Sequence, residues 1–524
     1  MRSFALAALV ALALTATVSA VAGAAGGSPV VGYVYVNDNT AGTNTIAGFS
    51  RAPNGSLTPL PGSPFSAGGA GTGAGISSQG ALQLSGDGHF LLAVDGGSNQ
   101  ISVLRIATDG SLQAVGAPVS SNGVDPVSIA VHGGLVYVAN AGNGGSNYTG
   151  FTLDANGHLQ PLAGSTVSLP NGSQPGDVLF SGDGSKLVGT RIGTLPMIVG
   201  SSLIDSFVVG AGGLLTAAPG SPFTPQGFGP FGSEFRPGNS GQLYVSNAHT
   251  SAGTPAPGSV SAFTVAGNGA LSPIGASPFS NPGVASCWVE ISHDGAYLYA
   301  VDTGSSSVVS YPIASDGSLG TPTNTTLKGS GLGAEDARLA PDGGTLFVVD
   351  AHAAELSSLA VNGGNLTELA GSPTALPAGS APAGVVVTEN SLQGSNLQGA
   401  NLENALLPNV NLQGSNLQGV NGNGGNFQGA QLQGVNAQHG SFENVDLTNA
   451  VLQGSNLQGD DFTGATLAGA NLTGSNLQAA NFTGANLTGA SLTGANLNRV
   501  TWSNTTCPDG TNSNADGGTC QGHL

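Results

Sequence analysis

An apolar residue recurs at every fifth position between Leu392 and Trp502. Each position whose number ends in 2 or 7 is Leu or Phe, apart from Gly422, Ala437 and the closing Trp502. Neither an α-helix nor a flat strand keeps one side chain in register at a period of five. The pattern therefore predicts a backbone that turns a corner once per repeat.

The residues around these centres follow an equally strict pattern. A small residue stands two positions before the centre and Asn often stands one position before it, as in Ala400-Asn401-Leu402 and Ser415-Asn416-Leu417. This fits a narrow square coil with four repeats per turn, in which the Asn positions stack from coil to coil. Residues 390–503 resemble the pentapeptide-repeat family, which implies a right-handed quadrilateral β-helix. We expect about six coils, roughly 28 Å long at the ~4.8 Å strand spacing, with loose packing at Gly422 and Ala437.

A second and longer period covers residues 29–389. A Gly, Asn or Asp turn followed by Leu recurs at intervals of 47 to 57 residues, at Leu57, Leu112, Leu159, Leu214, Leu271, Leu319 and Leu366. Each unit contains four short strand patterns, as in Gly80–Leu84, Phe90–Asp95, Gln100–Ile106 and the run that starts at Leu112. Seven copies of such a unit predict an all-β, seven-bladed β-propeller.

The two ends of this region predict how the ring closes. The first unit begins at Tyr33–Asn37, which has the pattern of a second strand, so it lacks an inner strand. The missing strand is predicted at Ala383–Thr388, directly before the period-five repeats. Pairing of the two ends removes the open sheet edges that invite aggregation.

The propeller region resembles the seven-bladed lactonase propellers, including bacterial 6-phosphogluconolactonases and fungal carboxymuconate cyclases. The resemblance rests on Leu135–Asn140, Ala296–Asp302 and Ala340–Asp350. It implies a site at the channel mouth built from His, Arg and Glu, commonly with a Pro-His pair that opens an inner strand. This chain departs from that pattern, since the corresponding places read Pro126-Val127 and Pro230-Phe231.

The strand alternation supplies its own candidates for catalysis. Counting back from each Asp-Gly turn places two rows of polar side chains on the channel face of the inner strands: Asp177 and Asp336 in one row, and Gln83, Glu290 and Arg338 in the next. Arg191 is expected near the rim of the channel. Glu234 is expected to face the channel as well if the turn at Pro237-Gly238 carries a β-bulge. Carboxylates and an Arg in a concave site would polarise a lactone carbonyl and position water.

The same residues also have a purely structural interpretation. Polar side chains commonly line propeller channels, and an ion pair between Glu290 and Arg338 would lock adjacent blades. We favour this structural role over catalysis. A phosphorylated lactone is disfavoured because its phosphate needs a cationic clamp, and the propeller holds few cations: Arg51, Arg105, Lys186, Arg191, Arg236, Lys328 and Arg338.

The first residues predict export. Met1-Arg2-Ser3 is a short cationic start, Phe4–Val18 is an apolar run too short to span a bilayer, and Val18-Ser19-Ala20 or Ala22-Gly23-Ala24 offers a cleavage site. We expect a signal peptide within residues 1–24, the alternative being an uncleaved anchor. In an oxidising compartment Cys507 and Cys520 would pair and close the tail at 504–524.

The amino-acid composition disfavours some classes of binding partner. Charged residues make up 7% of the chain and the net charge is −19, mainly because bases are scarce. Such a surface cannot neutralise phosphates, which disfavours nucleic acid. Mimicry of DNA is disfavoured as well, because only five acids fall between residues 391 and 502: Glu403, Glu443, Asp446, Asp460 and Asp461.

The remaining chemistry-bearing motif lies in the tail. Residues 509–517 carry oxygen ligands at alternating positions, as calcium loops do, but lack a final Glu, so a disulfide-closed turn is preferred. No cofactor or metal is expected. The sequence predicts an extracellular binding or scaffold protein whose β-helix is a spacer or self-association surface, the alternative being a lactonase-type hydrolase or cycloisomerase.

Overall fold

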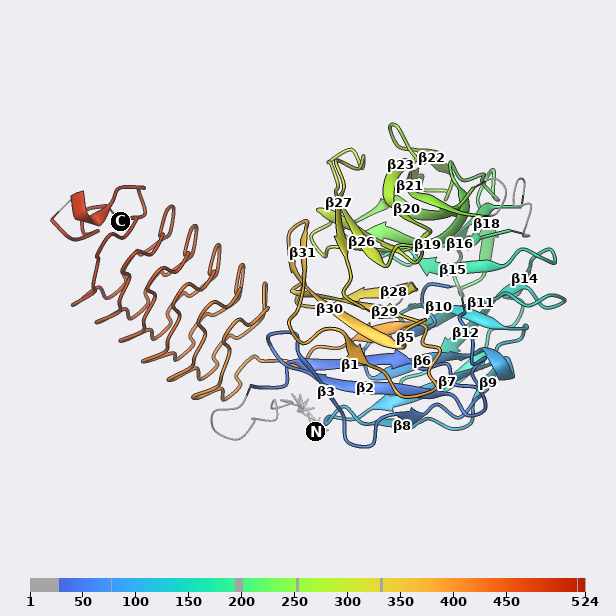
Figure 1. Ribbon diagram of the computed structural model, residues 1–524, viewed down its shortest axis with the longest axis horizontal. Helices are drawn as coiled ribbons and strands as arrows, with labels where there is room; N and C mark the ends of the chain where they lie inside the picture. The colour runs from blue at the N-terminus through green and yellow to red at the C-terminus, as the bar shows by residue number, and fades with distance from the viewer. Residues whose placement is uncertain are drawn as a thin grey trace, which may run out of the picture.

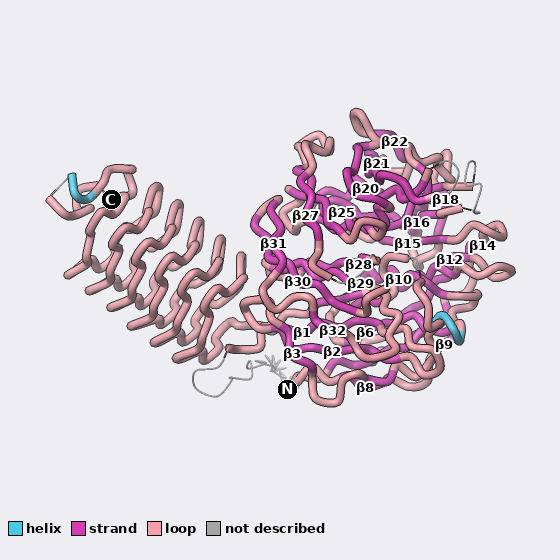
Figure 2. The backbone as a smooth tube through the Cα atoms, in the orientation of Figure 1, coloured by secondary structure: helices cyan, strands magenta, loops and turns pink. Residues whose placement is uncertain are grey.

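The structure, a computed structural model, describes residues 28–76, 78–193, 201–250, 254–329, 333–515 and 517–523. They form a round body of strands and a narrow stack of coils that extends from one side of it (Figure 1). The strands of Figure 2 are confined to the round body, and the coils are drawn as loops. The predicted signal peptide lies outside the described residues. Across the ranges that the structure describes, we find no helix with the length and apolar character needed to cross a membrane.

Seven antiparallel sheets make up the round body. Blade 1 contains β33 (Val385–Val387), β1 (Gly32–Asn37), β2 (Thr45–Arg51), β3 (Leu57–Pro59) and β4 (Phe65–Ser66). Blade 2 contains β5 (Leu82–Leu84), β6 (Phe90–Asp95), β7 (Gln100–Ile106), β8 (Leu112–Ala114) and β9 (Val119–Ser120), with the short 3₁₀ helix η1 (Gly96–Ser98) between β6 and β7. Blade 3 contains β10 (Pro126–His132), β11 (Leu135–Asn140), β12 (Asn147–Leu153), β13 (Leu159–Pro161) and β14 (Val167–Ser168). Blade 4 contains β15 (Pro175–Phe180), β16 (Lys186–Arg191), β17 (Leu203–Val209) and β18 (Leu215–Ala217).

The remaining blades follow the same order. Blade 5 contains β19 (Phe228–Arg236), β20 (Asn239–His249), β21 (Pro255–Val265), β22 (Leu271–Pro273) and β23 (Phe279–Val284). Blade 6 contains β24 (Ser286–Ile291), β25 (Tyr297–Asp302), β26 (Ser307–Pro312) and β27 (Thr323–Thr326). Blade 7 contains β28 (Ala334–Leu339), β29 (Thr345–Asp350), β30 (Glu355–Asn362), β31 (Asn365–Glu368) and β32 (Thr374–Ala375). The first strands β33, β5, β10, β15, β19, β24 and β28 contact one another around the ring, so the fold is the predicted seven-bladed propeller.

Local sequence explains the blade geometry. The second strand of a blade is apolar on both faces because it lies between neighbouring blades, and β6 is buried along its whole length. The turn before it is fixed by Asp87, whose Oδ1 accepts hydrogen bonds from Ser85 Oγ (2.5 Å) and from the His89 N–H (3.1 Å). Gly88 follows at φ +73°, a conformation that glycine adopts without steric cost.

Closure follows the prediction from the chain ends. β33 pairs with β1 in antiparallel register, with Val34 opposite Val387 and Val36 opposite Val385. Because β33 lies 348 or more residues away in sequence from β1, the ring depends on a contact between its two termini.

The C-terminal body is a four-sided β-helix. Parallel bridges join residues 20 apart in an unbroken series from Asn396–Asn416 to Asn486–Thr506, so each turn contains four five-residue repeats. The aromatic centres Phe442, Phe462, Phe482 and Trp502 stack with ring centroids 5.1 to 5.4 Å apart. At the predicted loose position around Ala437 the core contains an apolar cavity of about 20 Å³, which is large enough for one water molecule but offers no polar partner to hold it.

Both ends of the β-helix are held by specific contacts. At the first coils the Leu406 N–H donates to the Pro53 carbonyl (2.7 Å), which ties the β-helix to the turn between β2 and β3. At the far end Cys507 and Cys520 form the predicted disulfide. The tail, which includes η2 (Ser513–Ala515), covers the last coil, and Ser513 Oγ donates to the Trp502 carbonyl (2.9 Å).

Candidate functional site

The inner strands bring four of the five predicted catalytic residues to the centre of the propeller. Asp177 lies on β15, Glu290 on β24, and Asp336 and Arg338 on β28. Arg338 Nη1 lies 3.4 Å from Glu290 Oε2, so the expected ion pair between adjacent blades is present. The second oxygen, Glu290 Oε1, accepts a hydrogen bond from the Leu339 N–H (3.3 Å).

Asp177 and Asp336 are held by hydrogen bonds from other blades. Asp177 Oδ2 accepts from the N–H (2.9 Å) and the hydroxyl (2.6 Å) of Ser233, and Oδ1 accepts from Ser128 Oγ (3.2 Å). Asp336 Oδ2 accepts from the Gly80 N–H (3.3 Å). Asp177 therefore connects its strand to the blades on both sides, and Asp336 holds the segment that precedes β5 of blade 2, which is a structural function for both.

Burial raises the pKa of every carboxyl in this group. The pKa of Asp177 rises to about 7, because burial outweighs the hydrogen bonds from Ser233 and Ser128 and because Asp336 is close. The pKa of Asp336 rises to about 6 through burial, although Arg338 opposes the shift. Burial also raises the pKa of Glu290 against the effect of Arg338. A carboxyl that titrates near neutral pH can act as a general acid or base.

Glu234 is the carboxyl best placed for chemistry. The register of β19 against β20 shifts between Phe235 and Arg236, so the bulge on which its position depended is present. Glu234 is half-buried and lines a cavity of about 160 Å³ together with Gln83, Asp177, Arg338 and His132. Burial, followed by the nearby Glu290, raises its pKa well above the ordinary value, and Arg338 opposes the shift. Arg338 and Glu234 thus offer a cation and an acid or base in one hollow.

The segment Ser78–Gly80 crosses the channel above this cavity. The Ser78 carbonyl accepts from Trp288 Nε1 (2.7 Å), and the Gln79 N–H donates to the Gly176 carbonyl (2.9 Å). The Gln79 side chain donates to the Val289 carbonyl (3.1 Å) and accepts from the Val289 N–H (3.2 Å). Gln79 was not predicted, because it precedes the inner strand in a segment without periodicity.

Apolar side chains occupy two positions at the opposite mouth, where the inner strands begin. Val127 and Phe231 occupy the places where the lactonase resemblance implies catalytic side chains, and both are buried. Phe231 packs against Trp288 with ring centroids 6.0 Å apart and stacks on His249 at 5.8 Å. The family-type catalytic position is therefore filled by packed rings.

Arg191 does not join the channel group, which corrects the prediction. Its guanidinium forms a two-point ion pair with Asp205 of β17 in the same blade, with Nε 2.6 Å from Oδ2. Tyr148 donates its hydroxyl to the same carboxylate at 3.1 Å. Since Asp205 lies on the neighbouring strand within reach of a long side chain, the local carboxylate holds Arg191 away from the channel.

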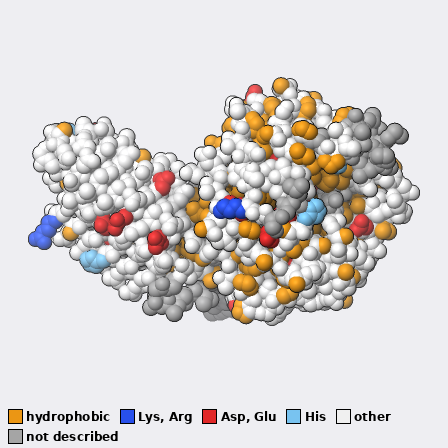
Figure 3. Space-filling model, in the orientation of Figure 1, with side chains coloured by type: hydrophobic (Ala, Val, Ile, Leu, Met, Phe, Trp, Pro, Cys, Tyr) orange, Lys and Arg blue, Asp and Glu red, His pale blue; other side chains and the backbone are white. Residues whose placement is uncertain are grey.

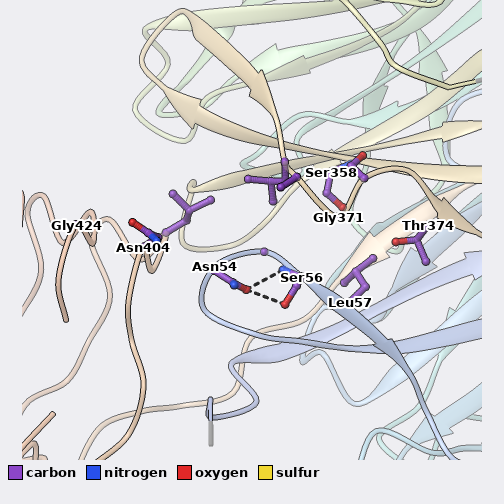
Figure 4. A pocket seen from close by; sticks show the side chains of 13 residues that line it. Asn54, Ser56, Leu57, Ser358, Gly371, Thr374, Asn404 and Gly424 are labelled. Carbon is purple, nitrogen blue, oxygen red and sulfur yellow. Dashed lines mark hydrogen bonds between the residues drawn. The ribbon is translucent and has the colours of Figure 1, made fainter. Parts of the chain in front are cut away.

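A second cavity, of about 440 Å³, lies at the junction of the propeller and the β-helix. Its lining comes from the turn before β3, from the segment around β31 and β32, and from the first coils (Figure 4). Asn54, Ser358, Thr374 and Asn404 supply polar groups, and Leu57 is among the apolar ones. Asn54 Oδ1 accepts from the N–H (3.1 Å) and the hydroxyl (2.7 Å) of Ser56, which leaves its NH₂ group as a donor for a ligand. No charged side chain lines this junction cavity among the described residues.

Neither cavity has the composition of a metal site. Across the described ranges no group of three or more His, Cys, Asp and Glu side chains is arranged to hold a metal ion. In the tail, Asp509 accepts hydrogen bonds from the N–H (2.9 Å) and hydroxyl (2.7 Å) of Thr511, as in a tight turn.

Comparisons with known proteins agree with both folds. The family model for the seven-bladed lactonase propeller matches residues 236–392, and the model for pentapeptide repeats matches 391–421, 426–459 and 461–499 in eight copies. No curated protein sequence matches the chain. The chain thus combines a propeller of the lactonase type with a pentapeptide-repeat β-helix.

Solved structures resemble the propeller. A putative 6-phosphogluconolactonase from Bacteroides uniformis is 20% identical with a TM-score of 0.53, and the match covers 68% of this chain and 100% of that one. The periplasmic gluconolactonase PpgL of Pseudomonas aeruginosa is 18% identical with a TM-score of 0.52, covering 68% of this chain and 99% of that one. At these identities the similarity shows the fold alone.

Proposed function

We propose that this protein is an exported, non-catalytic binding protein that holds an uncharged, hydroxyl-rich ligand in the junction cavity. The observation that carries the proposal is the lining of that cavity, which offers amide and hydroxyl groups beside leucine side chains and no charged group among the described residues. Cavities of roughly 300–1,000 Å³ at the boundary between two bodies are common places for small ligands.

Two further observations support binding without catalysis outside the cell. The channel mouth that the lactonase resemblance implies for chemistry is filled by Phe231, Trp288 and Gln79. A disulfide between Cys507 and Cys520 suits an oxidising compartment. The β-helix then serves to present one wall of the binding site and to extend the protein away from the propeller.

Calorimetric titration with uncharged mono- and disaccharides tests the proposal. Asn404→Gly removes one amide from the cavity at a residue with φ +54°, where glycine is tolerated, so binding should weaken about tenfold while the fold persists. Asn444→Gly is the matched control, since Asn444 has φ +56° and an equivalent place two coils further on. Equal affinities for Asn404→Gly and the native chain would overturn the assignment of the junction cavity.

The second candidate function is hydrolysis of an uncharged lactone in the channel cavity, favoured by the half-buried Glu234 next to Arg338. In that reaction the Glu234 carboxylate accepts a proton from water, the oxygen of the water bonds to the carbonyl carbon, and Arg338 stabilises the oxyanion. The ring C–O bond then breaks, the proton on Glu234 passes to the leaving ring oxygen, and the product is a hydroxy acid. A screen of lactones with native protein, Glu234→Gln and the exposed control Glu403→Gln distinguishes the two functions. Hydrolysis that only Glu234→Gln abolishes would replace the binding proposal.

A further inference from the structure

One face of the β-helix carries carboxamide side chains on every coil. One position before each corner of this face the residue is Gln on five coils and Asn on the sixth, and two positions earlier it is Asn on all six. The Asn row is Asn396, Asn416, Asn436, Asn456, Asn476 and Asn496, and the second row is Gln398, Gln418, Gln438, Gln458, Gln478 and Asn498. These twelve residues are called the amide face.

Hydrogen bonds order the Asn row. From Asn416 onward, each Asn Nδ2 donates to Oδ1 of the Asn one coil below, at distances from 2.9 Å for Asn496 to Asn476 up to 3.5 Å for Asn436 to Asn416. The ladder uses one N–H of each amide, so the second N–H remains for a partner. Because the ladder already fixes these side chains, a partner that binds them does not incur the full cost of ordering them.

The amide face is almost free of charge. The residues at its corners are Gly399, Gly419, His439, Gly459, Ala479 and Arg499, so a single full charge lies at the far end. The other three faces are interrupted, for example by Glu403, Glu443, Val451 and Pro408. In Figure 3 the β-helix is largely white, the colour of backbone and of side chains that are neither hydrophobic nor charged, with a few acidic side chains in red.

We propose that the amide face binds a neutral polysaccharide chain that runs along the axis of the β-helix. Successive coils are separated by ~4.8 Å, which is close to the length of one pyranose residue in an extended glycan. Each sugar residue then meets one Asn donor and one Gln that both donates and accepts. Weak contacts repeated over six coils add up to useful affinity, as in other solenoid surfaces.

The charge of the protein and the area of the amide face favour a neutral glycan over two other partners, an anionic polymer and a second copy of the chain. An anionic polymer would be repelled by a protein of net charge −19. A second copy of the chain has the same period, but the face is two side chains wide and about 28 Å long, well below the ~800 Å² per partner of a stable protein interface. A neutral polymer needs neither charge nor a wide interface, because it contacts only the two rows of side chains.

Titration with cello-oligosaccharides of three, four and six residues tests the proposal, since affinity should rise with chain length up to six. The variant Gln418→Ala/Gln438→Ala/Gln458→Ala should bind cellohexaose at least tenfold more weakly. The control Gln393→Ala/Gln413→Ala/Gln453→Ala removes three Gln side chains from a neighbouring face and should bind within twofold of the native chain. Thermal unfolding of both variants checks that the β-helix is retained.

Four outcomes overturn the proposal. The first is the absence of binding to both cellohexaose and the neutral β-1,3-glucan laminarin, and the second is an equal loss of cellohexaose affinity in both triple variants. The third is binding of anionic alginate as tight as that of cellohexaose. The fourth is a change of molar mass in light scattering for the Gln418→Ala/Gln438→Ala/Gln458→Ala variant. The last result would identify a second copy as the partner. The junction cavity is tested with mono- and disaccharides and Asn404→Gly, whereas the amide face is tested with cellohexaose and the Gln418→Ala/Gln438→Ala/Gln458→Ala variant, so failure of one proposal and failure of the other are separable.

Discussion

Arg51 Nη1 lies 2.6 Å from Asp342 Oδ2, and both side chains are fully buried, with 0% of each exposed to solvent. Arg51 ends β2 of blade 1, and Asp342 lies in the turn between β28 and β29 of blade 7. The pair therefore joins blade 1, which contains the closing strand β33, to blade 7. A buried ion pair of this kind contributes to the uniqueness of the closed ring only while both partners are present.

Removing one member of this pair should be more damaging than removing both. Asp342→Asn or Arg51→Met leaves an uncompensated buried charge, so the free energy of unfolding should fall by about 3–5 kcal/mol. The double variant Arg51→Met/Asp342→Leu should recover much of that loss. Urea unfolding measures all three, with Arg499→Met on the exposed end of the β-helix as the control. A loss below about 1 kcal/mol in both single variants would contradict the expected energetic role.

Asp460 should make the β-helix less stable as pH rises. Its side chain is fully buried, Oδ1 accepts from the Gly440 N–H (3.0 Å), and burial raises its pKa to about 8. Because the folded pKa lies above the unfolded value, unfolding releases a proton between about pH 4 and pH 8, and stability falls by up to ~1.4 kcal/mol per pH unit in that window.

The variant Asp460→Asn keeps an acceptor for Gly440 and removes the titration. Unfolding measured at pH 5 and pH 8 should differ clearly for the native chain and much less for Asp460→Asn. Asp461→Asn, on the outer side of the same coil, is the matched control and should retain the native difference. If Asp460→Asn showed the full native slope, another buried carboxyl would be its source.

Truncation should separate the two bodies at the closing strand. A chain that ends at Asn390 keeps β33 and its pairing with β1, so it should unfold cooperatively. A chain that ends at Ser380 lacks β33 and leaves β1 as an open edge, so it should fail to fold or should aggregate. Thermal unfolding and light scattering of the two proteins give the answer, and identical behaviour would show that the strand exchange is not needed.

Arg191 should matter for stability and not for ligand binding. Its replacement by Met strands the nearly buried Asp205, whose side chain is 4% exposed, with Tyr148 as its remaining partner in the described structure. We expect a loss of about 3 kcal/mol in the free energy of unfolding. Ligand titration at a temperature where the variant is folded should match the native chain. If the Met variant bound the ligand much more weakly but kept the native stability, Arg191 would belong to the functional site after all.

Opening the disulfide should promote association through the end of the β-helix. Cys507 and Cys520 enclose a short loop over the last coil, and such a link contributes about 3 kcal/mol. The variant Cys507→Ser/Cys520→Ser should loosen this cap and expose strand edges, so the molar mass in light scattering should rise with concentration. Cys287→Ser, at a buried free thiol, is the control. If the double variant kept the native molar mass at all concentrations, the disulfide-closed tail would not be needed to prevent association.

The sequence alone determined the architecture, because periodicity states which side chains share a face. The period of five predicted the four-sided coil, the longer repeat predicted seven blades, and the missing inner strand before Tyr33 predicted the closure by residues 383–388. Strand alternation was sufficient to place Glu290 opposite Arg338, since both face the channel from adjacent blades. The resemblances to pentapeptide repeats and to lactonase propellers rest on the same repeats.

The tertiary structure decided the contacts that no period encodes. Gln79 crosses the channel because of the path of an irregular segment, and Arg191 turns to Asp205 because a carboxylate on the adjacent strand is the nearer partner. Arg51 meets Asp342 only because the ring closes, and the buried Asp460 has a partner only because the coil below brings the Gly440 N–H to it. Each of these contacts joins residues that are brought together only by the folded path of the chain. Sequence spacing could therefore predict the strands that surround the site but not which side chains occupy it.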